Sequence, residues 1–268
     1  MANPFVFHEN IFENNTPTAT SAVAGFPITN ITDWRLGTAY RWKATSTATQ
    51  NIDIDAGSTQ SLNTLVIGGH NLGTGTASVE LLKGAASPAA TNVTGPTAIT
   101  SDLPWIITFN EGVARQHWRI QITSAGVAAQ TGIITLGRRI DYSAGALLDL
   151  DPYHRASSVE PFINNNGSPI GVNVRSKTKR FVMSYGGGDP GMTEAAFFAP
   201  SSGLKFRDDF LPHAVDSAKP FWFAWNIDVD AQDVYLCRVD GPEVSMPFVG
   251  STLSSGLQTT FIAHRETS

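Results

Sequence analysis

Apolar and polar residues alternate with a period of two in several stretches of this 268-residue chain. In residues 116–123, QHWRIQIT, tryptophan and isoleucine alternate with polar residues, and residues 49–56, TQNIDIDA, repeat the pattern. Successive side chains of a strand point to opposite faces of its sheet, so this pattern predicts antiparallel strands with one buried face. No long helical pattern separates such stretches, and the sequence therefore predicts an all-β chain built as a sandwich or jelly roll.

Shorter apolar runs, among them LNTLVIGG, ASVELL, PWIITF and TGIITLG, add further strands to the first half of the chain. Residues 84–102, by contrast, are small, polar and interrupted by proline and glycine, which favours a long surface loop. The apolar members of the alternating strands should form the first core, and we expect it to contain Ile52, Ile54, Leu65, Trp118 and Ile120.

The alternation stops in residues 143–157, SAGALLDLDPYHRAS, which predicts a division into domains at 1–145 and 156–268. The second part is also β-rich. Asn166-Gly167 is a typical turn of a hairpin, residues 179–185 read as a strand, and the aromatic run KPFWFAW precedes its expected partner strand VYLCRV. Residues 257–264, LQTTFIAH, form a last predicted strand.

Composition narrows the classes of function. Only 15% of the residues are charged, the net charge is −5, and lysine and arginine form no long run, which argues against nucleic acid as a partner. No apolar segment approaches the roughly 18 residues that span a membrane, and the N-terminus lacks the basic and apolar regions of a signal peptide, so we expect no membrane insertion. The low charge suits a protein that works inside an assembly.

Catalytic and cofactor motifs are weak. The six histidines show no zinc spacing, and the single cysteine reads as a small buried side chain. Glycines 186, 188 and 191 match G-x-G-x-x-G, but Pro190 removes a backbone donor and the βαβ alternation of a dinucleotide fold is missing, so a loop is preferred. Asp149, Asp151 and Glu160 are only the weakest candidates for a glycan-hydrolysing carboxylate pair. The chain is therefore expected to have no catalytic residue, no metal and no cofactor, and not to be an enzyme.

An ordered set of short motifs covers residues 1–140. The set consists of Asp33-Trp34-Arg35, Arg41-Trp42, the strand Ile52 to Gly57, the turn Gly69-His70-Asn71-Leu72, the strand Trp118-Arg119-Ile120 and the segment Gly132 to Gly137. It resembles the discoidin-like (galactose-binding-like) jelly roll, in the version found in tail proteins of tailed bacteriophages. Residues 155–268 resemble, less sharply, the β domains that such proteins dock onto a tail ring.

This resemblance implies a structural virion protein of the phage tail tip or baseplate, located in the virion tail and assembled in the host cytoplasm. Its partners would be other tail proteins and further copies of itself, as a homo-oligomer in a tail ring or tip. The alternative is a carbohydrate-binding adhesin that contacts a glycan of the host cell envelope.

Both alternatives assign a role to residues 33–44, DWRLGTAYRWKA, which are rich in aromatic and cationic residues. Such a cluster beside a strand start usually closes the end of a sandwich, and we expect its tryptophans to act mainly in folding. Loop aromatics and arginines at one end of a sandwich also bind sugars in discoidin-like modules. The candidate carbohydrate or interface residues are therefore Trp34, Arg35, Arg41, Trp42, His70 and Asn71.

Overall fold

The computed structural model describes residues 4–110, 114–142, 155–163, 169–185, 198–199, 204, 206–225, 227, 232–240, 248–249, 252–253 and 257–264. Its secondary structure is almost entirely strand, which confirms the predicted all-β class. The predicted division between residues 145 and 156 stays a prediction, because residues 143–154 lie outside the described part of the chain.

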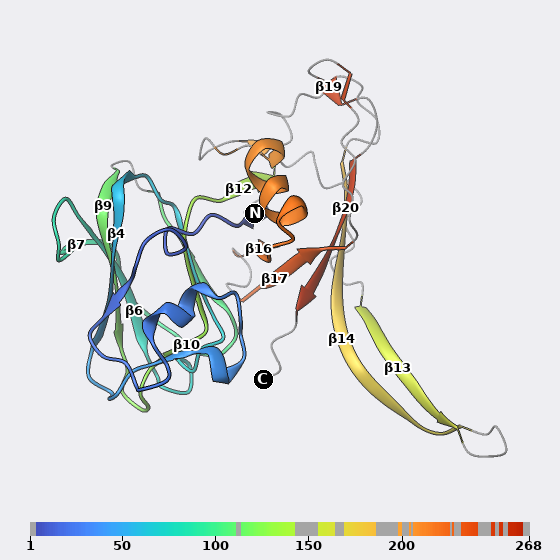
Figure 1. The fold of residues 1–268 in the computed structure, drawn as a ribbon, viewed down its shortest axis with the longest axis horizontal. Coiled ribbons are helices and arrows are strands. Elements are labelled where there is room, and N and C mark those ends of the chain that lie inside the picture. Colours follow the sequence, from blue (N-terminus) through green and yellow to red (C-terminus); the bar gives the residue numbers. More distant parts are fainter. Residues whose placement is uncertain are drawn as a thin grey trace.

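The first half of the chain is a sandwich of two antiparallel sheets (Figure 1). The larger sheet has five strands, in the order β2 (Thr18–Ala19), β4 (Gln50–Gln60), β9 (Arg115–Thr123), β6 (Ser78–Gly84) and β7 (Thr91–Ala98). The smaller sheet has three, in the order β11 (Ile133–Gly137), β5 (Thr64–Gly68) and β8 (Trp105–Thr108). This pair of sheets is the expected jelly-roll sandwich.

The two alternating stretches pair directly in the larger sheet. Ile52 of β4 lies opposite Ile120 of β9, and Ile54 lies opposite Trp118. All four side chains are buried in one core together with Leu65 of β5, which confirms the predicted core residues. On the outer face of the same strands, Arg119 donates two hydrogen bonds to the carboxylate of Asp53, at 2.7 and 2.9 Å. The alternation thus separates the core from a polar outer face.

Strand β7 corrects one expectation. Residues 91–98 were expected within a surface loop, yet they form an edge strand that pairs with β6. Most of its residues are exposed, so it carries no apolar alternation to reveal it, and an edge position tolerates Pro96. The prediction of a loop there was wrong because the strand is set by backbone pairing rather than by a buried face.

One eight-stranded sheet dominates the rest of the chain. Its order is β13 (Arg155–Ile163), β14 (Pro169–Tyr185), β20 (Leu257–His264), β17 (Val234–Val239), β16 (Phe221–Ala224), β1 (Phe5–Phe7), β12 (Ile140–Tyr142) and β15 (Phe198–Ala199). The predicted hairpin is present as β13 and β14, and the aromatic strand β16 pairs with β17 as expected. The turn residues 164–168 and the glycine motif at 186–191 lie outside the described residues.

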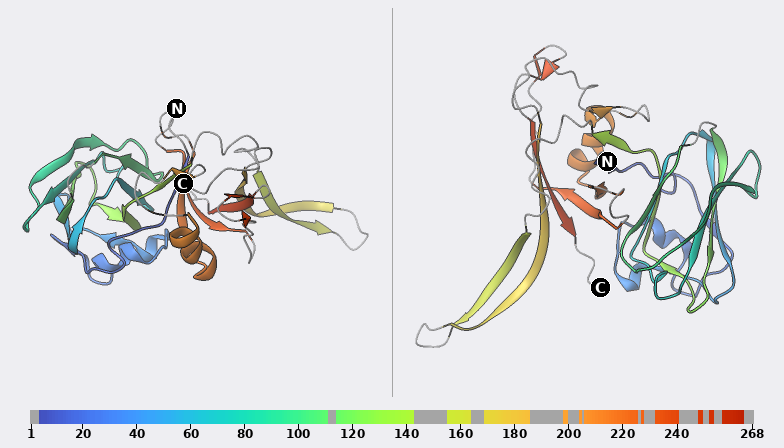
Figure 2. Two further views of the ribbon diagram at one scale, coloured as in Figure 1. Left: turned by 90° about the horizontal axis from the view of Figure 1, so that it is seen from above. Right: turned by 180° about the vertical axis from the view of Figure 1, so that it is seen from behind.

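The N-terminal strand belongs to this second sheet. Strand β1 pairs with β16 on one side and with β12 on the other, so both ends of the sandwich segment enter the eight-stranded sheet. Two consecutive π-helical turns, η4 (Phe206–Phe210) and η5 (Pro212–Asp216), supply buried side chains to the core on one face of this sheet. The sandwich packs against the opposite face, through residues such as Phe5 and Trp222, and Figure 2 shows the helical turns, in orange, next to the sheet.

Two 3-10 turns and a two-stranded pair complete the sandwich, and a second two-stranded pair lies apart from it. The turns close one end of the sandwich next to the first pair, and the second pair lies near the start of β20 (Figure 1). The elements are η1 (Ile28–Thr32), η2 (Thr38–Tyr40), β3 (Trp42–Lys43) with β10 (Gln130–Thr131), and β18 (Phe248–Val249) with β19 (Thr252–Leu253).

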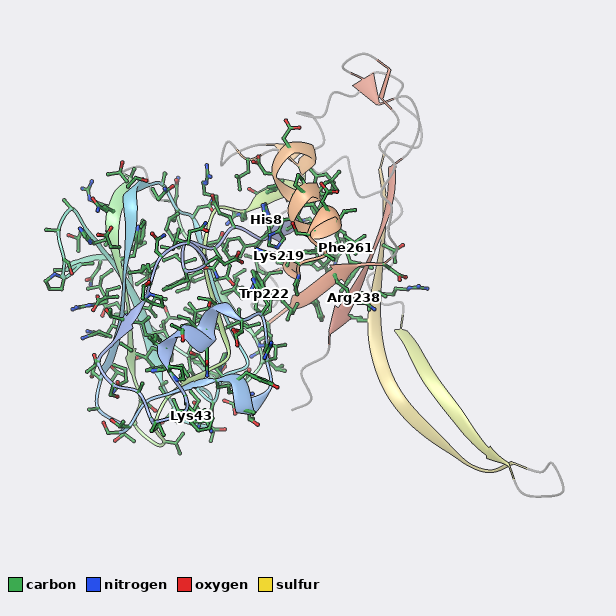
Figure 3. The ribbon with its side chains drawn as sticks, in the orientation of Figure 1. His8, Lys43, Lys219, Trp222, Arg238 and Phe261 are labelled. Atoms are coloured by element: carbon green, nitrogen blue, oxygen red, sulfur yellow. The ribbon has the colours of Figure 1, made fainter. Side chains whose placement is uncertain are left out.

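The three-stranded sheet is buried on both faces. Leu65 and Ile67 of β5 face the sandwich core, whereas Val66 between them packs with Phe5, Phe7 and other residues of the second sheet. Figure 3 places Trp222 at this junction, between the sandwich and the eight-stranded sheet. The continuous apolar runs in β5 and β11 follow from this double burial.

Candidate functional site

The cluster at residues 33–44 folds around one buried tryptophan. The Trp42 side chain is 0% exposed, and its indole Nε1 donates a hydrogen bond to the carbonyl oxygen of Ser21 at 2.9 Å. Strand β3, which carries Trp42, pairs with β10, and Ala44 donates its N–H to Ala129. Trp42 thus belongs to the core that closes this end of the sandwich, and its ring does not reach the surface.

Trp42 is flanked by a partly exposed surface, in which Arg35 and Tyr40 are exposed and Phe26 and Lys43 are half-buried. Tyr40, at the end of η2, is 45% exposed, and the guanidinium carbon of Arg35 lies 4.6 Å from the centre of its ring. Nearby, Nζ of Lys43 lies 3.7 Å above the ring of Phe26, and the N–H of Lys43 donates to the carbonyl of Phe26. We call Phe26, Arg35, Tyr40 and Lys43 the aromatic–cation surface. Figure 3 shows Lys43 at this end of the sandwich.

The segment that carries the aromatic–cation surface is fixed by side-chain hydrogen bonds to backbone carbonyls. Asn30 of η1 donates a side-chain hydrogen bond to the carbonyl of Arg41, and Nε of Arg41 donates to the carbonyl of Leu36, both at 3.3 Å. Tyr40 is also the single aromatic residue among the exposed large hydrophobic residues of the described chain. Its role could not be read from the sequence, because nothing in DWRLGTAYRWKA tells which of three aromatic rings faces solvent.

The other predicted candidates lie elsewhere. Trp34 has a φ of 57°, packs against the junction core, and donates from Nε1 to Oε1 of Glu13 at 2.7 Å. His70 is buried, its Nδ1 accepts a hydrogen bond from the N–H of Leu72, and burial lowers the pKa of its imidazole to about 4. Of the six candidates, Arg35 is exposed, Trp34, Arg41 and Asn71 are half-buried, and Trp42 and His70 are buried.

Asn71 has a structural partner on each side of its amide. Its Nδ2 donates to the carbonyl of Ala128 at 3.0 Å, and its Oδ1 accepts from the N–H of Gln130 at 2.8 Å. These bonds fasten the turn after β5 to the start of β10, which in turn pairs with the strand of Trp42. Asn71 therefore stabilises, through the backbone of β10, the strand β3 that carries Trp42 and Lys43.

A second polar cluster lies at the junction and was not foreseen. The rings of His8 and His213 are 5.0 Å apart, and the ring of Trp34 is 6.0 Å from that of His213. Burial, followed by the charges of His213 and Arg138, lowers the pKa of His8 to about 3. The two histidines are 205 positions apart, so no local sequence signal could have joined them.

Two carboxylates bind neighbouring side chains at the edge of this cluster. Glu13 accepts from Trp34 and also from Nζ of Lys219 at 2.9 Å, while Glu9 pairs with Arg138 at 2.5 Å. Burial also lowers the pKa of His213, whose Nε2 lies 2.8 Å from the carbonyl of Pro220. These groups tie the N-terminal segment and the sandwich to η5, as Figure 3 shows for His8 and Lys219. We call this set of contacts between the N-terminal segment and η5 the clasp, and its role is structural.

No group of three or more histidine, cysteine or acidic side chains that could hold a metal ion is found in the part of the chain that the structure describes. Within that part, no helix is both long and apolar enough to cross a membrane.

Comparison with known proteins finds similarity of structure alone. No protein-family model and no curated protein sequence matches this chain. Among solved structures, the chain is similar to the lectin domain of Lectinolysin complexed with Lewis B antigen, with 15% identity and a TM-score of 0.39 over 50% of this chain and 99% of that one. It is also similar to chitosan-binding module 1 of a chitosanase/glucanase from Paenibacillus sp. IK-5, with 19% identity and a TM-score of 0.39 over 48% and 98%.

A third similar structure is a family 32 carbohydrate-binding module from Clostridium perfringens in complex with GalNAc-β-1,3-galactose. It has 15% identity and a TM-score of 0.42 over 48% of this chain and 99% of that one. At such identity and overlap, the similarity carries no conclusion about a ligand of this chain.

Proposed function

We propose that this chain is a carbohydrate-binding protein and that the aromatic–cation surface contacts the sugar, without a chemical step. The observation that carries the proposal is the exposed ring of Tyr40, with the guanidinium of Arg35 over one face, which leaves the other face of the ring for the sugar in this proposal. An aromatic ring offers a flat apolar face for the C–H groups of a pyranose, and guanidinium and ammonium groups donate hydrogen bonds to hydroxyls and carboxylates.

Rigidity of the support adds to the proposal. The surface sits on η2 and β3, next to the fully buried Trp42, and the segment is fixed by the hydrogen bonds of Asn30 and Arg41. A surface that is already ordered loses little conformational entropy when it binds. The ligand in this proposal is a glycan of a host cell envelope, which makes the chain an adhesin.

The experiment is a glycan-array screen followed by calorimetric titration with the best ligand. Tyr40→Ala should weaken binding at least tenfold, about 1.4 kcal/mol, whereas Tyr40→Phe keeps the ring and should bind like the parent. Val127→Ala is the matched control, since Val127 is an exposed apolar residue that is not one of the four residues of the aromatic–cation surface. Equal affinity of the parent and Tyr40→Ala would refute the proposal.

The second candidate is a structural virion protein of a phage tail tip or baseplate, located in the virion tail. It is supported by the motif set of residues 1–140 and by one observation, a two-stranded ribbon of β13 and β14 that projects from the body (Figure 1). Its partners in this proposal are other tail proteins and further copies of the chain. Quantitative mass spectrometry of purified particles tests it, and a virion free of the chain would exclude it.

A further inference from the structure

The ribbon leaves the eight-stranded sheet as two strands. Arg155 of β13 lies opposite Lys179 of β14, and the pairing continues out to Ile163 and Pro169. On its other edge, β14 pairs with β20 from Lys179 to Tyr185. From Pro169 to Thr178, the second edge of β14 therefore has no partner strand among the described residues, and the outer edge of β13 has none either.

A ribbon of this kind is poorly supported by its own chain. Both views of Figure 2 show it extending away from the rest of the molecule. The nine residues of β13 span about 30 Å at ~3.3 Å per residue. An isolated two-stranded hairpin is at best marginally stable in water, because three strands or a packed face are needed for independent stability. The shape therefore calls for a partner that covers the ribbon.

The net charge of the ribbon segment indicates the charge that its partner should carry. Residues 155–180 contain one acidic residue, Glu160, against five basic ones, so they carry a net charge of +4. The basic residues are Arg155, Arg175, Lys177, Lys179 and Arg180. Because the whole chain has a net charge of −5, everything outside the ribbon segment carries −9. The body of a second copy thus has the charge that the ribbon would attract.

At the base of the ribbon, the same attraction already operates within the chain. Arg180 pairs with Asp240 of the body, and Lys179 contacts the hydroxyl of Tyr235, which itself donates to Asp233.

We propose that the β13–β14 ribbon docks on an acidic surface of a second copy of this chain. The ribbon and the body are different surfaces, so the contact is head-to-tail, and such contacts build rings when the rotation closes and filaments when it does not. Pro161 and the register shifts at Ser158/Val159 and Phe162/Ile163 interrupt the edge of β13, so electrostatic docking contributes more than continuous strand addition. The inference rests on the assembly role proposed as second candidate and is independent of glycan binding.

Sedimentation velocity on the full chain, over a range of concentrations at low and high salt, tests the inference. The parent should associate at low salt and dissociate as the salt concentration rises, because salt screens exposed charges. Arg175→Glu should weaken association about tenfold or more. Arg238→Glu is the matched control, an identical change at an exposed position of β17 in the same sheet, and it should associate like the parent.

Hydrogen exchange gives a second measurement that does not depend on a variant. Amides of residues 155–179 should become protected in the parent as its concentration rises into the associating range. A parent that stays monomeric at every concentration would overturn both the ribbon contact and the self-assembly role. Association that Arg175→Glu leaves intact, with an unprotected ribbon, would overturn the ribbon contact and leave self-assembly standing. In both cases the glycan titration is read separately.

Discussion

Trp222 of β16 donates a hydrogen bond from its indole Nε1 to Oγ1 of Thr135 in β11, at 2.9 Å and out of contact with solvent. The bond joins the eight-stranded sheet to the three-stranded sheet of the sandwich. Around it, Phe5, Phe7 and Val66 complete an apolar junction. The two halves are thus held by a core of their own as well as by β1 and β12, which lie at the two ends of the sandwich segment and belong to the eight-stranded sheet.

This bond gives the first prediction. Trp222→Phe removes the donor and leaves the hydroxyl of Thr135 with one partner fewer, which should lower the free energy of unfolding by about 1–3 kcal/mol. The loss should shrink when Thr135→Val is added, since the second change removes the acceptor. Urea unfolding of the parent, both single variants and the double variant measures the coupling, and simple additivity of the two losses would contradict the bond.

The second prediction concerns the glycine under the same indole. A Cβ at Gly68 would lie 2.4 Å from Cη2 of Trp222, so Gly68→Ala should force the ring to move and lower the stability by about 1–3 kcal/mol. Gly95→Ala in β7 is the control, because nothing lies within 4 Å of its Cβ. Thermal melts should separate the two variants, and equal melting temperatures would mean that the junction is looser than described.

The sequence patterns predicted the strands that have one buried face and one solvent-exposed face. Strand β9 was predictable because Trp118, Ile120 and Ile122 face the core while Arg119 and Gln121 face outward. The sheet order was not, since pairing between distant strands leaves no local signal. Strand β1 illustrates this, as its three buried residues FVF show neither a period nor the identity of their partners, β12 and β16.

The candidate site was predictable as a segment and not as a set of side chains. The sequence indicated the segment DWRLGTAYRWKA as the place of a candidate surface, but three aromatic rings in it have three different environments. Trp42 is buried, Trp34 packs at the junction, and Tyr40 is exposed. What decides among them is the backbone of η2 and the left-handed φ of Trp34, neither of which follows from residue type.

The third prediction is loss of stability in mild acid. The pKa of His8 is lowered to about 3 and that of His213 is also lowered, in both cases mainly by burial. A folded-state pKa below the unfolded value of 6.5 means that the fold favours the neutral imidazole. The stability this contributes is complete above about pH 6.5 and is lost as the pH falls toward 3. Buried His70, with a pKa of about 4, acts in the same direction.

Unfolding measurements at pH 7 and pH 5 test this third prediction, because ordinary carboxylates stay largely ionised over that window. Each fully shifted histidine contributes at most about 1.4 kcal/mol per pH unit below 6.5. The double variant His8→Gln/His213→Gln should show a shallower pH dependence than the parent. An unchanged slope would mean that the clasp between the N-terminal segment and η5 does not exclude the protonated rings.

The fourth prediction separates folding from binding at the aromatic–cation surface. Trp42 is fully buried and donates to Ser21, so Trp42→Ala should cost about 3–5 kcal/mol through the cavity and the lost hydrogen bond. That is a large share of the ~5–15 kcal/mol that stabilises a domain, and low yield or insolubility is an expected form of the result. Tyr40→Ala, at an exposed position of the same end, should change stability by about 0.5 kcal/mol or less.

Thermal melts and glycan titration on both variants should therefore give opposite patterns: Trp42→Ala loses stability first, and Tyr40→Ala loses affinity alone. A Tyr40→Ala variant that melts far below the parent would make Tyr40 part of the fold and would remove the observation on which glycan recognition rests.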